Sequence, residues 1–289
     1  MAQPTPKVDT HLHLTRWWPE IKATGYRRDL DFSLRGLLRE MDGAGLDYGV
    51  LIQSNDAPNT RDGLAEARQH VAKSRGRLRL VSTVDPTETD PSVDEMIGLW
   101  EEVPELSGIK LYPGYHPFYP HDRRLDPVYE YARRRKVPIL IHTGDTMDTH
   151  GQIKFSRPLE IDEVAVRFRD VTIVLCHFGN PWIDEAAEVV YKNPNTYADT
   201  SGLLAHPSYP LFRQMVDLCR KRVQEAILMV GSTSRVLYGS DWPLQGLPVS
   251  MSLVESLELP EADRAAILGG NAVRLFGLPR SRRSRAGSS

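Results

Sequence analysis

Four apolar, strand-like runs of this chain each end on a histidine or an aspartate. The first ends in His11-Leu12-His13, and because side chains alternate along a strand, its two imidazoles point to the same face. Three later runs end at His142, His177 and Asp241. A single His-x-His pair is a weak signal, since paired histidines also serve as surface or capping groups. The repetition at four strand ends predicts a metal site.

Strand-like and helix-like segments alternate along the chain, which predicts parallel β/α units. Eight such strands in 289 residues favour a single-domain α/β fold, the (β/α)8 TIM barrel. An open, doubly wound sheet is the alternative, because periodicity does not report closure. However, no Gly-x-Gly-x-x-Gly or Walker-type loop follows any strand, so the nucleotide-binding reason for an open sheet is missing. We expect strands near residues 7–14, 48–54, 78–85, 108–113, 138–143, 172–178, 196–201 and 236–241.

In a closed barrel the carboxyl ends of all strands meet at one mouth, so the histidines and the aspartate converge there. Three or four imidazoles with one carboxylate suit a divalent ion such as Zn²⁺, with Fe or Mn less favoured. Such an ion lowers the pKa of a bound water toward about 7. Asp241 is the expected base that takes a proton from this water. We expect His177 either to bind the ion or to stand beside it and relay a proton.

Composition and charge exclude several classes of function. Lys and Arg number 36 against 38 Asp and Glu, so the net charge of −2 offers no field that would recruit nucleic acid or an anionic membrane. A basic, Ser-rich end at residues 278–289 is expected to be a disordered tail that follows a barrel domain at residues 1–277. No apolar run approaches the roughly 18 residues that a membrane helix needs. We therefore expect no membrane partner.

The two cysteines, Cys176 and Cys219, lie far apart and match no metal or redox spacing. This usage indicates a reducing compartment, and we expect a cytoplasmic protein. Because Cys176 is the neighbour of His177, we expect its side chain to point to the opposite face of the strand, away from the metal, and to pack in the core.

Several motifs together resemble the amidohydrolase superfamily. The resemblance runs from Val8 to Gly277 and is closest to the amidohydrolase-related group, which includes aminocarboxymuconate semialdehyde decarboxylases, resorcylate decarboxylases and pyrone dicarboxylate lactonases. It rests on Val8-Asp9-Thr10-His11-Leu12-His13, Ile141-His142-Thr143-Gly144, Cys176-His177-Phe178-Gly179, Gly239-Ser240-Asp241-Trp242-Pro243 and the stretch from Ile267 to Gly277.

This resemblance implies a distorted (β/α)8 barrel. It also implies that His11, His13, His142 and Asp241 are metal ligands and that His177 is a ligand or a catalytic residue. Most members of the superfamily hydrolyse amides, lactones or esters, but the group also contains metal-dependent, non-oxidative decarboxylases. The resemblance therefore specifies the metal better than the reaction.

Lys110, in Gly108-Ile109-Lys110-Leu111-Tyr112-Pro113, departs from the decarboxylase pattern. The segment resembles the one in dihydroorotases, in which the lysine is carboxylated and bridges two metal ions. A carboxylated Lys110 would make the site binuclear. A free ammonium that binds a substrate carboxylate is the favoured alternative, with one ion in the site. A purely structural ion pair is a third reading.

The loops after the strand ends carry further candidates for substrate binding. Arg16 follows the histidine pair directly and could bind a carboxylate, while Tyr112 begins an aromatic loop after the fourth strand. Trp182, just past His177, could line the pocket. Trp17 and Trp18 are equally compatible with stacking on a planar ring or with closing the barrel mouth.

The main functional hypothesis is a metal-dependent hydrolase. It would cleave a C–O or C–N bond of a small carboxylated lactone, amide or ester through metal-activated water, with Asp241 as the base. The first alternative is a decarboxylase of an aromatic or muconate-like acid, in which Asp241 or His177 delivers a proton to the ring carbon. The second is a catalytically silent metal-binding barrel. Barrel enzymes often pair through exposed helices, so a homo-oligomer is left open.

Overall fold

Eight parallel strands form the centre of the protein. The computed structural model describes residues 5–14, 30–53, 59–204 and 210–280. The strands pair in sequence order, each with the next, and every pair is parallel. This arrangement confirms the predicted TIM barrel. The strands are β1 (Val8–His13), β2 (Tyr48–Ile52), β3 (Leu78–Thr83), β4 (Leu106–Leu111), β5 (Ile139–Ile141), β6 (Ile173–Leu175), β7 (Thr196–Asp199) and β8 (Val236–Leu237).

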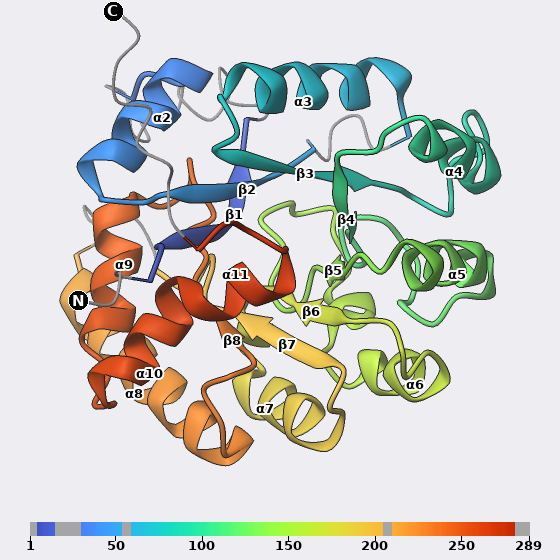
Figure 1. Ribbon diagram of the computed structural model, residues 1–289. Coiled ribbons are helices and arrows are strands. Elements are labelled where there is room, and N and C mark those ends of the chain that lie inside the picture. The colour runs from blue at the N-terminus through green and yellow to red at the C-terminus, as the bar shows by residue number, and fades with distance from the viewer. Residues whose placement is uncertain (1–4, 15–29, 54–58, 205–209, 281–289) are drawn as a thin grey trace, which may run out of the picture.

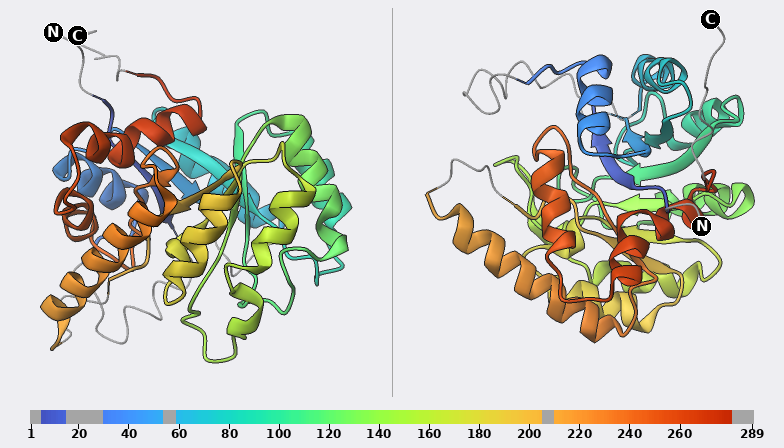
Figure 2. Two further views of the ribbon diagram at one scale, coloured as in Figure 1. Left: turned by 90° about the horizontal axis from the view of Figure 1, so that it is seen from below. Right: turned by 60° about the vertical axis from the view of Figure 1, so that its left-hand side comes forward.

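Helices surround this ring of strands, as Figures 1 and 2 show from three sides. Most of these helices bury one face, as an amphipathic barrel helix must, whereas the five-residue helix Glu261–Ala265 has no buried residue. Seven of them alternate with the strands: α2 (Leu34–Gly43), α3 (Arg61–Lys73), α4 (Val93–Glu101), α5 (Asp126–Arg135), α6 (Glu160–Arg167), α7 (Ile183–Lys192) and α8 (Phe212–Val230). After β8 follow α9 (Leu247–Glu255), α10 (Glu261–Ala265) and α11 (Asn271–Leu275).

The ring closes where the segment after β8 meets β1. Thr10 N donates to Tyr238 O at 2.9 Å and His13 N donates to Trp242 O at 2.8 Å. In return, Asp241 N donates to His11 O at 2.9 Å. We call these three hydrogen bonds the β8–β1 seam. Because β8 itself is short, the seam extends the pairing beyond it and brings the two ends of the chain together.

Two apolar clusters fill the protein. The larger one lies between the strands and the helices and includes Trp100, whose Nε1 donates to Ser82 Oγ at 2.9 Å. The smaller one fills the barrel interior with side chains from alternate strand positions and is joined by Ala272 and Val273 of α11. Figure 1 shows α11 lying across the ring of strands. One end of the barrel is therefore plugged, and the site must form at the other.

The described helices include none that is both long and apolar enough to span a membrane. The division between a barrel at 1–277 and a tail at 278–289 stays a prediction, because residues 281–289 lie outside the described residues.

Gly269 packs against the backbone of Pro6 and Lys7, and this contact allows a stability test. A Cβ on Gly269 would lie 1.8 Å from Pro6 O and 3.0 Å from Lys7 Cα, whereas a Cβ on Gly98, within α4, meets nothing within 4 Å. Gly269→Ala should therefore lower the free energy of unfolding by about 1–3 kcal/mol or more through overpacking. Gly98→Ala should raise it by roughly 0.5–1 kcal/mol, because alanine costs less backbone entropy in a helix. Urea denaturation of both variants checks this, and equal effects would contradict the packing account.

Candidate metal centre

Three of the predicted ligands bring their donor atoms together at the barrel mouth. His13 Nε2 lies 3.3 Å from Asp241 Oδ1, and His11 Nε2 lies 3.7 Å from the same oxygen. All three donor atoms lie within 4.8 Å of one another. Two imidazole nitrogens and one carboxylate oxygen at this spacing fit a divalent ion such as Zn²⁺ or Mn²⁺. These three residues are called the donor set below.

The β8–β1 seam places the donor set. His11 and His13 are two residues apart on β1 and face the barrel interior, as alternation requires. Asp241 follows β8 and adopts a left-handed backbone with φ of 66°, an uncommon conformation for a residue with a side chain. Its amide donates to His11 O, and its carbonyl accepts from Leu244 N at 2.8 Å. These bonds hold the aspartate beside the two histidines.

His142 and His177 stand next to the donor set without joining it. The ring of His177 lies 4.8 Å from that of His11 and 4.9 Å from that of His142, centroid to centroid. The Nε2 of His142 donates to Asp145 O at 3.0 Å. Burial lowers the pKa of both imidazoles. The role of His142 as a ligand therefore stays a prediction.

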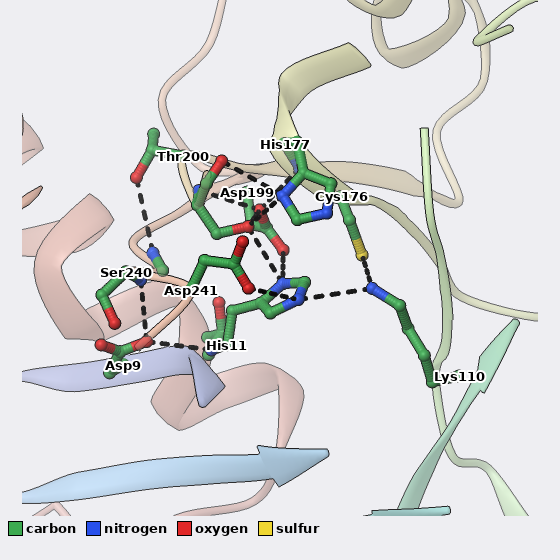
Figure 3. Close-up of polar contacts among 12 residues, drawn as sticks. Asp9, His11, Lys110, Cys176, His177, Asp199, Thr200, Ser240 and Asp241 are labelled. Atoms are coloured by element: carbon green, nitrogen blue, oxygen red, sulfur yellow. Dashed lines mark hydrogen bonds and ion pairs between the residues drawn. The ribbon is translucent and has the colours of Figure 1, made fainter. Parts of the chain in front are cut away.

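The expected direction of the Cys176 side chain is wrong. Its Sγ lies 2.9 Å from Lys110 Nζ, inside the barrel and close to the site (Figure 3). The prediction assumed that strand alternation continues through His177. In the structure β6 ends at Leu175, and His177 and Phe178 adopt left-handed backbones with φ of 59° and 44°. Alternation does not extend through such a turn, so the thiol and the imidazole both face the mouth.

Lys110 is a buried cation beside the donor set. Its side chain is fully buried, and its Nζ lies 3.4 Å from His11 Nε2 and 4.9 Å from the ring centre of Tyr112. Among the described residues no carboxylate lies within 4 Å of this ammonium. Burial and the Lys110 charge together lower the pKa of His11 to about 3. The site thus carries a positive charge that lacks an ion-pair partner in the described part of the chain.

Sequence reasoning missed Asp199, the last residue of β7. This fully buried carboxylate accepts from His11 Nδ1 at 2.9 Å and from His177 N at 2.9 Å. It also accepts from the amide and the hydroxyl of Ser201. An acidic residue two positions before the end of the expected strand at 196–201 was the available signal, but the strand ends at Asp199 itself.

The predicted substrate-binding residues have different outcomes. Tyr112 lies over Lys110, and its ring faces that of His142 at 6.4 Å, so it forms one wall of the site. Tyr115, in the same aromatic loop, lies edge to face with His142, and the two ring centres are 4.8 Å apart. Trp182 instead packs against the Arg157 guanidinium at 5.0 Å, and no described contact joins it to the donor set. Arg16 lies outside the described residues.

The family model for amidohydrolases matches residues 8–278. The chain belongs to this family. It is 34% identical, over 316 aligned positions, to a gamma-resorcylate decarboxylase of Polaromonas sp. strain JS666, and the match covers 91% of each protein.

Two solved structures show the same fold at low sequence identity. One is an amidohydrolase from Burkholderia multivorans with bound zinc, which has a TM-score of 0.71 and 19% identity over 95% of this chain and all of the other. The second is a dihydroxybenzoic acid decarboxylase from Polaromonas sp. JS666 with bound manganese and the inhibitor 2-nitroresorcinol. It has a TM-score of 0.64 and 21% identity over 96% of this chain and 98% of the other. Of these two barrels, one holds zinc and the other manganese.

These comparisons contradict the expected hydrolysis of a lactone, amide or ester. The relative that matches 91% of the chain is a decarboxylase, and decarboxylases also appear among the structural neighbours. The physical reason for the error is that histidines and a carboxylate at strand ends specify an ion at the mouth. They do not specify whether water or a substrate carbon reacts beside it. Because hydrolysis is contradicted, Asp241 has no attacking water to deprotonate, and that expected role is wrong as well.

A buried acid on β1 gives the metal-free protein a testable pH dependence. Burial raises the pKa of Asp9 from 3.8 to about 7, although amides of His11 and Ser240 donate to it. A raised folded-state pKa stabilises the fold below pH 3.8, and this contribution is lost as the pH rises through about 7. Between about pH 4 and pH 7, wild-type stability should therefore fall relative to that of Asp9→Asn, which cannot ionise. Urea midpoints measure this difference, and parallel curves would contradict it.

Proposed function

We propose that this protein is a metal-dependent, non-oxidative decarboxylase of a hydroxylated aromatic carboxylic acid. The observation that carries the proposal is the 34% identity to a gamma-resorcylate decarboxylase over 91% of both chains. The donor set, the neighbouring histidines and the buried ammonium are consistent with this reaction. His11, His13 and Asp241 would hold the ion, with a single ion favoured. When bound, the ion anchors the substrate carboxylate and offsets its negative charge.

The reaction exchanges carbon dioxide for a proton on the ring. The bond between the ring carbon and the carboxylate carbon breaks, its electron pair stays on the ring carbon, and that carbon takes the proton. The chain must therefore supply a proton donor, a cation near the carboxylate and walls that orient a flat ring. Each of these parts has a candidate among the described residues.

We assign the proton transfer to His177. Its Nδ1 donates to Ser201 Oγ at 2.8 Å and to Ser201 O at 3.2 Å, so the proton that the ring carbon takes is the second proton of the imidazolium form, carried on Nε2. The backbone of Gly202 lies directly behind this ring, since a Cβ there would come within 2.7 Å of His177 Nδ1. A ring held from behind in this way keeps its second nitrogen aimed at one point, as a general acid requires.

Lys110 is the cation that we assign to the anionic part of the substrate. Its buried ammonium lies between the thiol of Cys176 and the imidazole of His11 (Figure 3). A hydrogen bond between a charged donor and a carboxylate is strong in such a site. Tyr112 and Tyr115 would contact the ring itself, because aromatic side chains stack on planar rings. In this reading Lys110 is not carboxylated.

The donor set can be tested through Asp241→Asn, which keeps the shape of the side chain and removes its charge. We expect this variant to lose bound metal and to release carbon dioxide from 2,6-dihydroxybenzoate at least about a thousandfold more slowly, since several kcal/mol of stabilisation depend on the ion. Metal analysis and a carbon dioxide assay with Mn²⁺ or Zn²⁺ measure both effects. Full activity in Asp241→Asn would show that Asp241 does not hold the ion, whereas a wild type that binds the ion and releases no carbon dioxide would favour a catalytically silent barrel.

The role of His177 is tested by His177→Asn, with metal content as the internal control. Because His177 lies outside the donor set, the variant should retain its ion while kcat falls by about 10²–10⁴, the usual contribution of a general acid. Loss of the ion together with activity would show that His177 is a ligand and would reject its assignment as the proton donor.

Lys110→Met tests the ammonium. Removing a charged hydrogen bond should lower kcat/KM by about 10- to 150-fold, which corresponds to roughly 1.5–3 kcal/mol. Cys176→Ala is the matched control, because it removes the neighbouring thiol and keeps the charge. Intact-protein mass spectrometry under native conditions completes the test. An added carboxylate on Lys110, with two ions per chain, would overturn the free-ammonium assignment.

A further inference from the structure

Asp199 connects the two histidines that have different tasks in the site. Its Oδ2 accepts from His11 Nδ1 at 2.9 Å, and its Oδ1 accepts from the backbone amide of His177 at 2.9 Å. Figure 3 shows the carboxylate between these two residues, next to the side chain of Asp241. It is fully buried, so water does not compete for its oxygens. No role has been assigned to it in the reaction described above.

We infer that Asp199 is a positioning residue that presents His11 Nε2 to the metal ion and fixes the backbone from which His177 acts. The inference rests on the proposed function, since it concerns the same ion. Asp199 does not belong to the donor set, and it acts only through His11, His177 and Ser201.

Asp199 determines which nitrogen of His11 carries the proton. A neutral imidazole carries one N–H, and an ionised carboxylate can only accept. The contact between Nδ1 and Asp199 therefore places the proton on Nδ1 and leaves a lone pair on Nε2. Nε2 is the atom that lies 3.7 Å from Asp241 Oδ1, within the donor set. A carboxylate behind a metal-binding histidine also raises the basicity of the nitrogen that binds the ion.

Asp199 also stabilises the left-handed turn at His177. Two successive residues with side chains have positive φ there, which costs free energy unless the surroundings hold them. Asp199 Oδ1 accepts from the amide of His177, from the amide of Ser201 at 3.0 Å and from the Ser201 hydroxyl. The same hydroxyl oxygen contacts His177 Nδ1. The carboxylate of Asp199 thus stabilises the backbone turn at His177 directly and the imidazole ring of His177 through the Ser201 hydroxyl.

Asp9 shows why this role belongs to Asp199. Asp9 is also buried on the strand that carries His11, but its hydrogen bonds come from the backbone amides of His11 and Ser240. A carboxylate that contacts an amide does not select which imidazole nitrogen holds the proton. Among the described hydrogen bonds, only the Asp199 contact joins a carboxylate to His11 Nδ1.

The test compares the affinity for Mn²⁺ and Zn²⁺ of the wild type and Asp199→Asn by competition with a chromogenic chelator. Loss of a partner behind a metal-binding histidine should weaken the affinity by about 10- to 100-fold. Asp85→Asn is the matched control. Asp85 is a buried aspartate whose Oδ2 lies 2.7 Å from His116 Nδ1, and His116 is outside the donor set. Asp85→Asn should keep the wild-type metal affinity, even if the loss of this buried charge lowers its thermal stability.

The outcomes separate this inference from the proposed function. A wild type that binds neither ion would reject the proposed function. A wild type that binds the ion while Asp199→Asn binds it equally well would reject the positioning role alone. Nitrogen-15 NMR of the metal-free wild type adds a measurement that needs no variant. It should show His11 protonated at Nδ1, and protonation at Nε2 would overturn the inference even if Asp199→Asn does not fold.

Discussion

The hydrogen bonds of the β8–β1 seam are the constraint on which the rest of the site depends. They pair the amide of Asp241 with the carbonyl of His11, and the amide of His13 with the carbonyl of Trp242, so that closing the barrel and assembling the donor set are one event. A strand pair whose backbone groups are buried must satisfy them. The backbone pairing therefore sets the spacing of the side chains that could hold the ion. Its hydrogen bonds allow the two segments little displacement.

Much of this arrangement could be predicted because it follows from strand geometry. Alternation along β1 places His11 and His13 on one face, and the strand-end rule found Asp241 more than two hundred positions later. The same rule applied to β7 would have found Asp199. Alternation failed for Cys176, because it presumes a strand that continues, whereas β6 ends at Leu175 and a left-handed turn follows at His177 and Phe178. No local pattern in the sequence announces such a turn at a residue other than glycine.

The loops and the reaction are less accessible to sequence reasoning. Trp182 follows His177 in the sequence, yet it packs against Arg157, a residue from a separate loop, and such a partner is set by tertiary packing. The reaction is a second example. A donor set of histidines and an aspartate supports hydrolysis and decarboxylation alike, because both need a cation beside an anionic group. The choice depends on what occupies the neighbouring space, and the proposed decarboxylation rests on the comparison with a relative over nearly the whole chain.

The distance along the chain between the halves of the donor set has a consequence for biosynthesis. His11 and His13 leave the ribosome more than two hundred residues before Asp241 does. A nascent chain therefore offers an incoming ion only an isolated histidine pair, without the carboxylate that completes the set. Since metal affinity is coupled to the folded arrangement of ligands, the complete donor set exists only after Asp241 has been made and the β8–β1 seam has closed. An ion that needs all three donors would therefore bind a closed barrel and would not nucleate the early steps of its folding.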